Sequence, residues 1–159
     1  MIELFIPGEP VGKQRARVFP IRMKTGQVIR RGVTPEKTAN YETLVKQLFI
    51  ASYSGFVPLE GPLSLELEAF LLIPKSASQK KQAAMEAGEI LPEKRPDADN
   101  LMKTVADALQ GLAFRNDSQI ADAWIRKRYG RTPGMRIVLG TCLELAGRVS
   151  DGAQGGPRA

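Results

Sequence analysis

The sequence predicts one α/β (α+β) domain, in which a mixed β-sheet carries helices packed on one face. A chain of 159 residues with 43% hydrophobic and 25% charged residues is typical of a folded domain with one sizeable core. Apolar residues alternate with polar ones in some segments and recur at helical spacing in others. We therefore expect one domain over residues 1–145 and a Gly-rich disordered tail over residues 146–159.

The first half of the chain predicts two strands, a basic segment and a helix. Residues 2–6 form a short apolar run that ends at a Pro-Gly pair, which indicates a strand. Residues 13–31 hold seven cations and no acid, which predicts a basic loop or ribbon. A helix is expected to start at Thr34-Pro35, with Thr34 as its cap and Pro35 at its first position, and to run to Gly55. Residues 63–73 have an apolar side chain at every second position, alternating with Ser64, Glu66 and Glu68, which predicts a half-buried strand.

The second half predicts two helices and two strands. Residues 78–88 are polar and indicate a short exposed helix, whereas residues 100–110 have apolar side chains at helical spacing and end at Gly111. Residues 120–129 and 135–145 read as strands. Because Gly and Pro dominate residues 130–134, we expect these two strands to form a hairpin.

Composition excludes several classes of function. The chain has no histidine and one cysteine, Cys142, which excludes His-dependent triads, His- or Cys-ligated zinc sites, Fe–S clusters and an internal disulfide. The absence of a long apolar run and of a signal-peptide pattern predicts a cytoplasmic protein with no membrane partner. The net charge of +6 favours a polyanionic partner such as nucleic acid.

The candidate chemistry lies in residues 95–103. Asp97 and Asp99, two apart in an extended segment after Pro96, are expected to point the same way and to attract Mg²⁺ or Mn²⁺. Lys103 lies one helical turn after Asp99, and Asp117 precedes a strand that could return it to the pair. Each residue also has a structural interpretation: Asp99 as a helix cap, Asp97 as a loop acid, Lys103 paired with Asp107, and Asp117 in a turn.

The order and spacing of these motifs resemble the RusA family of Holliday junction resolvases. The matching segments are Lys94-Arg95-Pro96-Asp97-Ala98-Asp99-Asn100-Leu101-Met102-Lys103, then Asp107-Ala108-Leu109, Asn116-Asp117-Ser118-Gln119-Ile120 and Lys127-Arg128-Tyr129-Gly130. The resemblance runs from Ile2 to about Leu145. It implies a homodimeric, Mg²⁺-dependent endonuclease of branched DNA, a type often carried by prophages, with Mn²⁺ able to substitute. Asp97, Asp99 and Asp117 would be the metal ligands and Lys103 the catalytic lysine, whereas Asn116 stands where relatives often have a second Asp.

Basic residues around these motifs are candidate DNA contacts, because a surface that follows the phosphate backbone needs positive charge. They are Lys13, Arg15, Arg17, Lys94, Arg95 and Lys127. We expect a four-way DNA junction as partner and a two-fold homodimer, with residues 120–145 around Trp124 at the interface, because paired cuts need two acid clusters. Residues 8–14 resemble a nucleotide-binding loop too weakly to predict a nucleotide cofactor. The main alternative is a non-catalytic DNA-binding module with structural acids.

Overall fold

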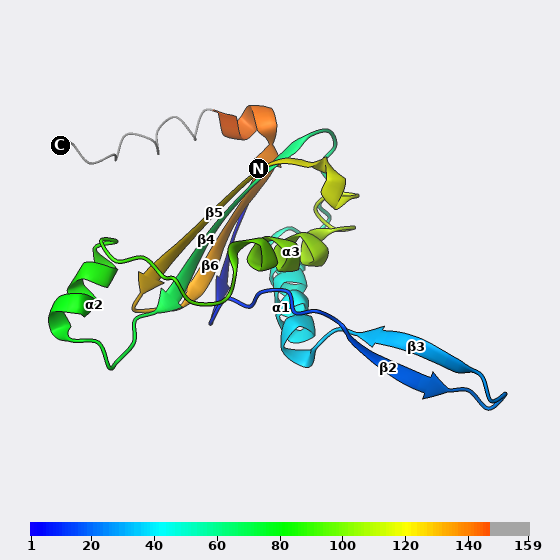
Figure 1. Ribbon diagram of the computed structural model, residues 1–159. Coiled ribbons are helices and arrows are strands. Elements are labelled where there is room, and N and C mark those ends of the chain that lie inside the picture. Colours follow the sequence, from blue (N-terminus) through cyan, green and yellow to red (C-terminus); the bar gives the residue numbers. More distant parts are fainter. Residues whose placement is uncertain (147–159) are drawn as a thin grey trace.

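The computed structural model describes residues 1–146 and has a four-stranded mixed sheet at its centre (Figure 1). The strands β1 (Ile2–Pro7), β4 (Leu63–Leu72), β5 (Ile120–Gly130) and β6 (Gly134–Thr141) lie in the order β1-β6-β4-β5. β4 runs parallel to β5 and antiparallel to β6, which pairs antiparallel with β1. The predicted mixed sheet is confirmed.

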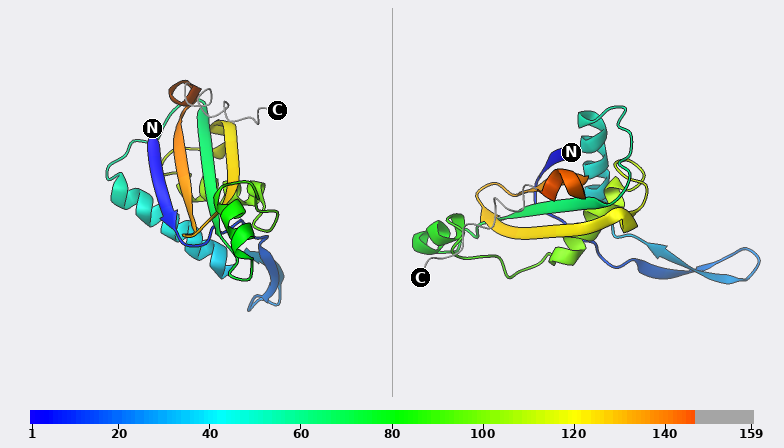
Figure 2. Two further views of the ribbon diagram at one scale, coloured as in Figure 1. Left: turned by 90° about the vertical axis from the view of Figure 1, so that its left-hand side faces the viewer. Right: turned by 90° about the horizontal axis from the view of Figure 1, so that it is seen from above.

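Two helices cover one face of this sheet. α1 (Glu36–Ser52) and α3 (Ala98–Leu109) pack against each other behind the strands, while the short α2 (Gln79–Glu86) lies at one end, near β5 (Figure 2). The core between the helices and the sheet contains alternate residues of β1, β4 and β6 together with Leu101, Leu109 and Phe114. Each fully buried side chain of this size contributes about 1.5–3 kcal/mol of hydrophobic stabilisation.

The basic segment forms a two-stranded antiparallel ribbon that projects from the body (Figure 1). Its strands are β2 (Arg17–Arg22) and β3 (Val28–Val33), so the ribbon interpretation is confirmed. The helix that follows begins one residue later than expected, because Pro35 occupies the N-cap position and no side chain caps α1.

Two expectations about the C-terminal half are wrong. β5 and β6 do not form a hairpin, because β4 lies between them. Gly and Pro at residues 130–134 show that the chain turns there, but they do not show whether the two strands that flank the turn pair with each other. In addition, β6 ends at Thr141 and residues 142–146 are helical.

The early end of β6 has a local cause. The Glu144 carboxylate accepts hydrogen bonds from the backbone N–H and the hydroxyl of Thr141, and the Glu144 N–H donates to Thr141 Oγ1. This reciprocal arrangement is a capping box, which starts a helix. The tail is predicted over residues 146–159, but Ala146 is the last described residue of this helix, and residues 147–159 lie outside the described part of the chain. Within residues 1–146, no helix is long and apolar enough to cross a membrane.

Candidate active site

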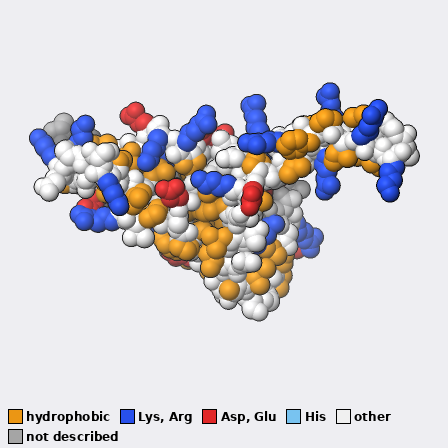
Figure 3. All heavy atoms as spheres, turned by 90° about the horizontal axis from the view of Figure 1, so that it is seen from below, with side chains coloured by type: hydrophobic (Ala, Val, Ile, Leu, Met, Phe, Trp, Pro, Cys, Tyr) orange, Lys and Arg blue, Asp and Glu red, His pale blue; other side chains and the backbone are white. Residues whose placement is uncertain are grey.

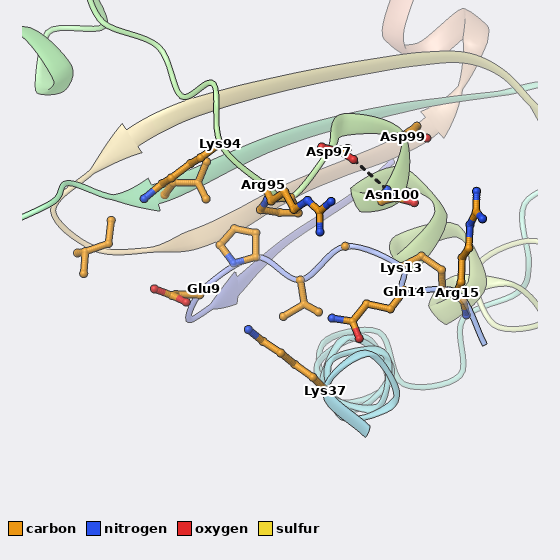
Figure 4. A pocket seen from close by; sticks show the side chains of 16 residues that line it. Glu9, Lys13, Gln14, Arg15, Lys37, Lys94, Arg95, Asp97, Asp99 and Asn100 are labelled. Carbon is orange, nitrogen blue, oxygen red and sulfur yellow. Dashed lines mark hydrogen bonds between the residues drawn. The ribbon is translucent and has the colours of Figure 1, made fainter. Parts of the chain in front are cut away.

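A pocket of about 790 Å³ lies where the start of α3 meets the segment that follows β1 (Figure 4). Asp97 and Asp99 line it, and so does Glu9. The cations that line the same pocket outnumber these acids: Lys13, Arg15, Lys37, Lys94 and Arg95. The site therefore combines carboxylates that suit a divalent cation with positive charge that suits a phosphate.

The two pocket aspartates belong to the start of a helix and not to an extended segment, so that part of the sequence prediction is wrong. Asp97 is the N-cap residue of α3, with extended backbone angles, and Asp99 lies in the first helical turn. The helix begins at Ala98 because Pro96 restricts only the residue before it. Both side chains line the pocket, Asp97 from the N-cap position and Asp99 from the first helical turn.

Both carboxylates remain available for a ligand. Asp97 makes no capping hydrogen bond with its side chain, and its Oδ2 accepts only a long hydrogen bond of 3.5 Å from Asn100 Nδ2. Neither Asp97 nor Asp99 forms an ion pair within residues 1–146, and both are exposed. The positive end of the α3 dipole stabilises negative charge here, whether it comes from a carboxylate or from a phosphate.

Lys103 and Asp117 lie outside this pocket. Lys103 is exposed on α3, one turn after Asp99, and the alternative interpretation of a Lys103–Asp107 pair is wrong, because Asp107 binds Lys13 instead. Asp117 begins a short 3-10 turn, η1 (Asp117–Gln119), which follows the other end of α3. A helix of this length spans about 18 Å. Among residues 1–146, no three Asp, Glu or Cys side chains are grouped so that they could hold a metal ion.

The turn that carries Asp117 is held by its neighbours. Asn116 Oδ1 accepts the Ser118 N–H at 3.0 Å, and Gln119 Oε1 accepts the Asn116 N–H at 3.1 Å. Gln119 also donates through Nε2 to the carbonyls of Leu59 and Gly61. Asn116 therefore caps the η1 turn with its side-chain amide, a structural role that does not require the carboxylate many relatives have at this position.

Lys13 has a different environment from the one expected of a DNA contact. Its ammonium lies 2.6 Å from Glu42 Oε1 and 2.7 Å from Asp107 Oδ2, and all three side chains are partly buried. Burial lowers the pKa of Lys13, but the hydrogen bonds and charges of Asp107 and Glu42 outweigh it and leave the pKa above its usual value. The charge of Lys13 is thus engaged in tying the pocket segment to α1 and α3.

Gly12 brings the same segment close to α3. A Cβ at this position would lie 3.0 Å from the Cβ atoms of both Pro96 and Asn100, and the Lys13 N–H donates to the Asn100 carbonyl at 2.8 Å. Gly12, Glu42 and Asp107 carry no local pattern that marks them as positioning residues. A close approach between segments so far apart in the chain leaves no mark in one sequence.

Two further expected DNA contacts also support the loop before Asp97. Lys127 Nζ donates to the Lys94 carbonyl at 2.6 Å, and Lys94 Nζ lies 5.6 Å from the centroid of the Tyr129 ring. Arg15, Arg17 and Arg95, by contrast, form no ion pair within the described chain. These three guanidinium groups are free to bind phosphate oxygens.

Comparison with known proteins identifies the family of this chain. The family model described as endodeoxyribonuclease RusA matches residues 7–139, which is most of the chain. The chain belongs to the RusA family. An uncharacterized protein of Bacillus subtilis (strain 168), YqaN, is 31% identical over 140 residues, which cover 87% of this chain and 94% of that protein. The RusA match includes the pocket, the ribbon, Lys103 and Asp117, and it places the protein in a family of endodeoxyribonucleases.

Proposed function

We propose that this RusA-family protein is a Mg²⁺-dependent, structure-selective endodeoxyribonuclease that resolves Holliday junctions by paired phosphodiester cleavage in DNA recombination and repair. The proposal rests on Asp97 and Asp99, two carboxylates that form no ion pair within residues 1–146 and line a cation-rich pocket. The chain that carries them matches an endodeoxyribonuclease family. No histidine is needed for this chemistry.

The donor set at the pocket suits Mg²⁺. This ion prefers oxygen ligands and is usually held by one or two carboxylates together with water and substrate phosphate. Asp97 and Asp99 would hold it, whereas Asp117, which the family pattern implies as a third ligand, lies outside this pocket in the structure. When bound, the cation neutralises charge on the phosphodiester and activates water for attack.

The protein's own cations supply the remaining charge stabilisation. Arg15 and Arg95 line the pocket without an ion pair, so they can bind the phosphate in the ground state and in the more highly charged transition state. Lys103, one turn from Asp99, neutralises a non-bridging oxygen or positions the water. The α3 N-terminus adds backbone N–H groups and its positive dipole end.

We test cleavage on a panel of four-way junctions, flaps and linear duplexes with and without Mg²⁺. The proposal expects Mg²⁺-dependent cleavage with a preference for four-way junctions, and loss of cleavage in Asp97→Asn with junction binding retained. Full cleavage by Asp97→Asn would contradict the site. Binding without cleavage by the unchanged protein would instead favour the non-catalytic DNA-binding module.

We also propose that the active form is a two-fold homodimer, because resolving a junction needs two related cuts and one chain carries one acid pair. Two features of the fold support β5 as the interface. β5 is an edge strand within the described sheet, and Trp124 on it is 47% exposed. Edge strands and exposed aromatic residues commonly pair with a partner.

Sedimentation at micromolar concentration tests the dimer. We expect a species of twice 17.4 kDa, and a shift to 17.4 kDa in Trp124→Arg while the control Trp124→Phe stays dimeric. A species of 17.4 kDa with full junction-resolving activity would overturn the dimer.

A further inference from the structure

The β2–β3 ribbon exposes both apolar and basic side chains to solvent. Every residue of β2 and β3 is exposed, although Val18, Phe19, Val28 and Ile29 are apolar. Among the described helices and strands, none packs substantially against the ribbon. Because a two-stranded hairpin alone is at most marginally stable in water, this composition indicates an element that is completed by a partner.

The charge of the ribbon identifies the chemistry of that partner. Residues 17–33 contain five cations and no acid, and none of the five forms an ion pair within residues 1–146. The pairing register places two cations on each face of the ribbon, with Lys24 in the turn: Arg17 and Arg31 on one face, and Arg22 and Arg30 on the other. In Figure 3 the projecting arm shows Lys and Arg side chains among hydrophobic ones and no acid. A polyanion with negative charge on both sides of the ribbon fits this pattern.

The base of the ribbon is fixed next to the acid pocket. Lys13 and Arg15 line the pocket, and β2 starts two residues after Arg15. The ion pairs from Lys13 to Glu42 and Asp107 attach this base to α1 and α3. A phosphate bound in the pocket therefore brings the adjoining duplex to the ribbon.

We propose that the β2–β3 ribbon enters the major groove of the DNA duplex arm beside the cleaved phosphate. The major groove, about 12 Å wide, admits a two-stranded ribbon. Six residues at about 3.3 Å each make the ribbon about 20 Å long, which equals roughly six base pairs. The cations on the two faces of the ribbon contact phosphates on the two walls of the groove. The ribbon thus extends the binding site along one arm of the substrate.

This inference rests on the proposed DNA substrate and is tested by binding, so that it can fail independently of cleavage. The main variant replaces residues 18–32 with Gly-Ser-Gly, a linker that closes easily because Arg17 and Val33 are paired neighbours. A double variant, Arg22→Gln/Arg30→Gln, removes charge without removing the ribbon. The matched control Lys46→Gln/Lys75→Gln removes the same charge from exposed positions on α1 and after β4.

The measurements are footprints and dissociation constants on a four-way junction, made in an Asp97→Asn background. The intact ribbon is expected to protect about six more base pairs of one arm than the shortened protein does. Shortening should weaken binding at least tenfold, and the Arg22/Arg30 variant should reduce the slope of log K against log salt by about 2, at about 0.9 per phosphate contact. The control variant should change neither.

Two results would overturn the proposal. One is an unchanged footprint and salt slope in both ribbon variants. The other is conversion of a dimer to a 17.4 kDa species on shortening, in the absence of DNA, which would show that the ribbon binds a second copy of the chain. Absence of cleavage by the unchanged protein would overturn the proposed function while leaving the footprint result intact.

Discussion

β4 and the β2–β3 ribbon are both rich in residues that favour strands, but they lie in opposite environments. Every second residue of β4 from Leu63 to Leu71 is buried, whereas Val18 and Phe19 in the ribbon are more than half exposed. β4 pairs with a strand on each side and is covered by helices on one face, whereas each strand of the ribbon pairs only with the other ribbon strand. The comparison shows that stability lies in the body of the molecule and that the ribbon's side chains remain free for a partner.

The largest expected effect is the loss of cleavage when an acid in the body of the molecule is replaced, with DNA binding retained. Asp99→Asn should lower cleavage by on the order of 10³-fold, because it removes a proposed ligand for the cation that activates water. Asp117→Asn tests whether the third acid of the family pattern, which lies outside the pocket, is also needed. Binding of the four-way junction should stay the same or become tighter, since a negative charge facing phosphate is lost. Single-turnover cleavage and direct binding measure the two effects. Cleavage by Asp117→Asn at the normal rate would show that the pocket pair acts without it.

A pair of aromatic substitutions compares the two regions in stability. Phe114→Ala should lower the free energy of unfolding by about 3–5 kcal/mol, because Phe114 is fully buried in the core. Phe19→Ala should change it by less than about 0.5 kcal/mol, because Phe19 is exposed on the ribbon. Urea denaturation of both variants gives the comparison. An equal loss in Phe19→Ala would mean that the ribbon is part of the folding unit.

The ion pairs at the ribbon base should have an intermediate, pH-dependent effect. Lys13→Met leaves Glu42 and Asp107 facing each other without a cation, which should cost about 2 kcal/mol at pH 7, less than for fully buried pairs.

The unchanged protein supplies the control for this pH effect. Its Lys13 has a pKa above the usual 10.5, so the contribution of Lys13 to stability is complete below that pH and is lost only as the pH rises through the raised pKa. Thermal denaturation at pH 7, 9 and 11 measures both proteins, and the difference in stability between them is expected to narrow only at the highest pH. A difference that is the same at every pH would exclude the charge of Lys13 as its cause.

The smallest effect concerns the contact between the pocket segment and α3. Gly12→Ala places a methyl group 3.0 Å from the Cβ atoms of Pro96 and Asn100, so the segment must shift by a few tenths of an ångström. We expect a loss of about 1 kcal/mol in stability and a measurable drop in cleavage. Gly32→Ala in the ribbon is the matched control, because its new Cβ would meet only the Ala16 Cβ, at 3.6 Å.

Local patterns in the sequence predicted most elements of the body. The alternation in residues 63–73 and the helical spacing in residues 100–110 each correspond to a real element, β4 and α3. These predictions succeed because one face of each element is buried against the same core, which imposes a regular period. The acid pair, the basic segment and the turn before β5 are also local features and were found in the same way.

The tertiary structure alone decided what depends on contacts between distant residues. It placed β4 between β5 and β6, seated Lys13 between Glu42 and Asp107, and left Asp117 outside the pocket that holds Asp97 and Asp99. A period along the chain reports which face of an element is buried, but strand order and ion-pair partners arise from packing between segments that share no local pattern. The residue types, their spacing and the family pattern were therefore readable from the sequence, whereas the neighbours of each charge were not.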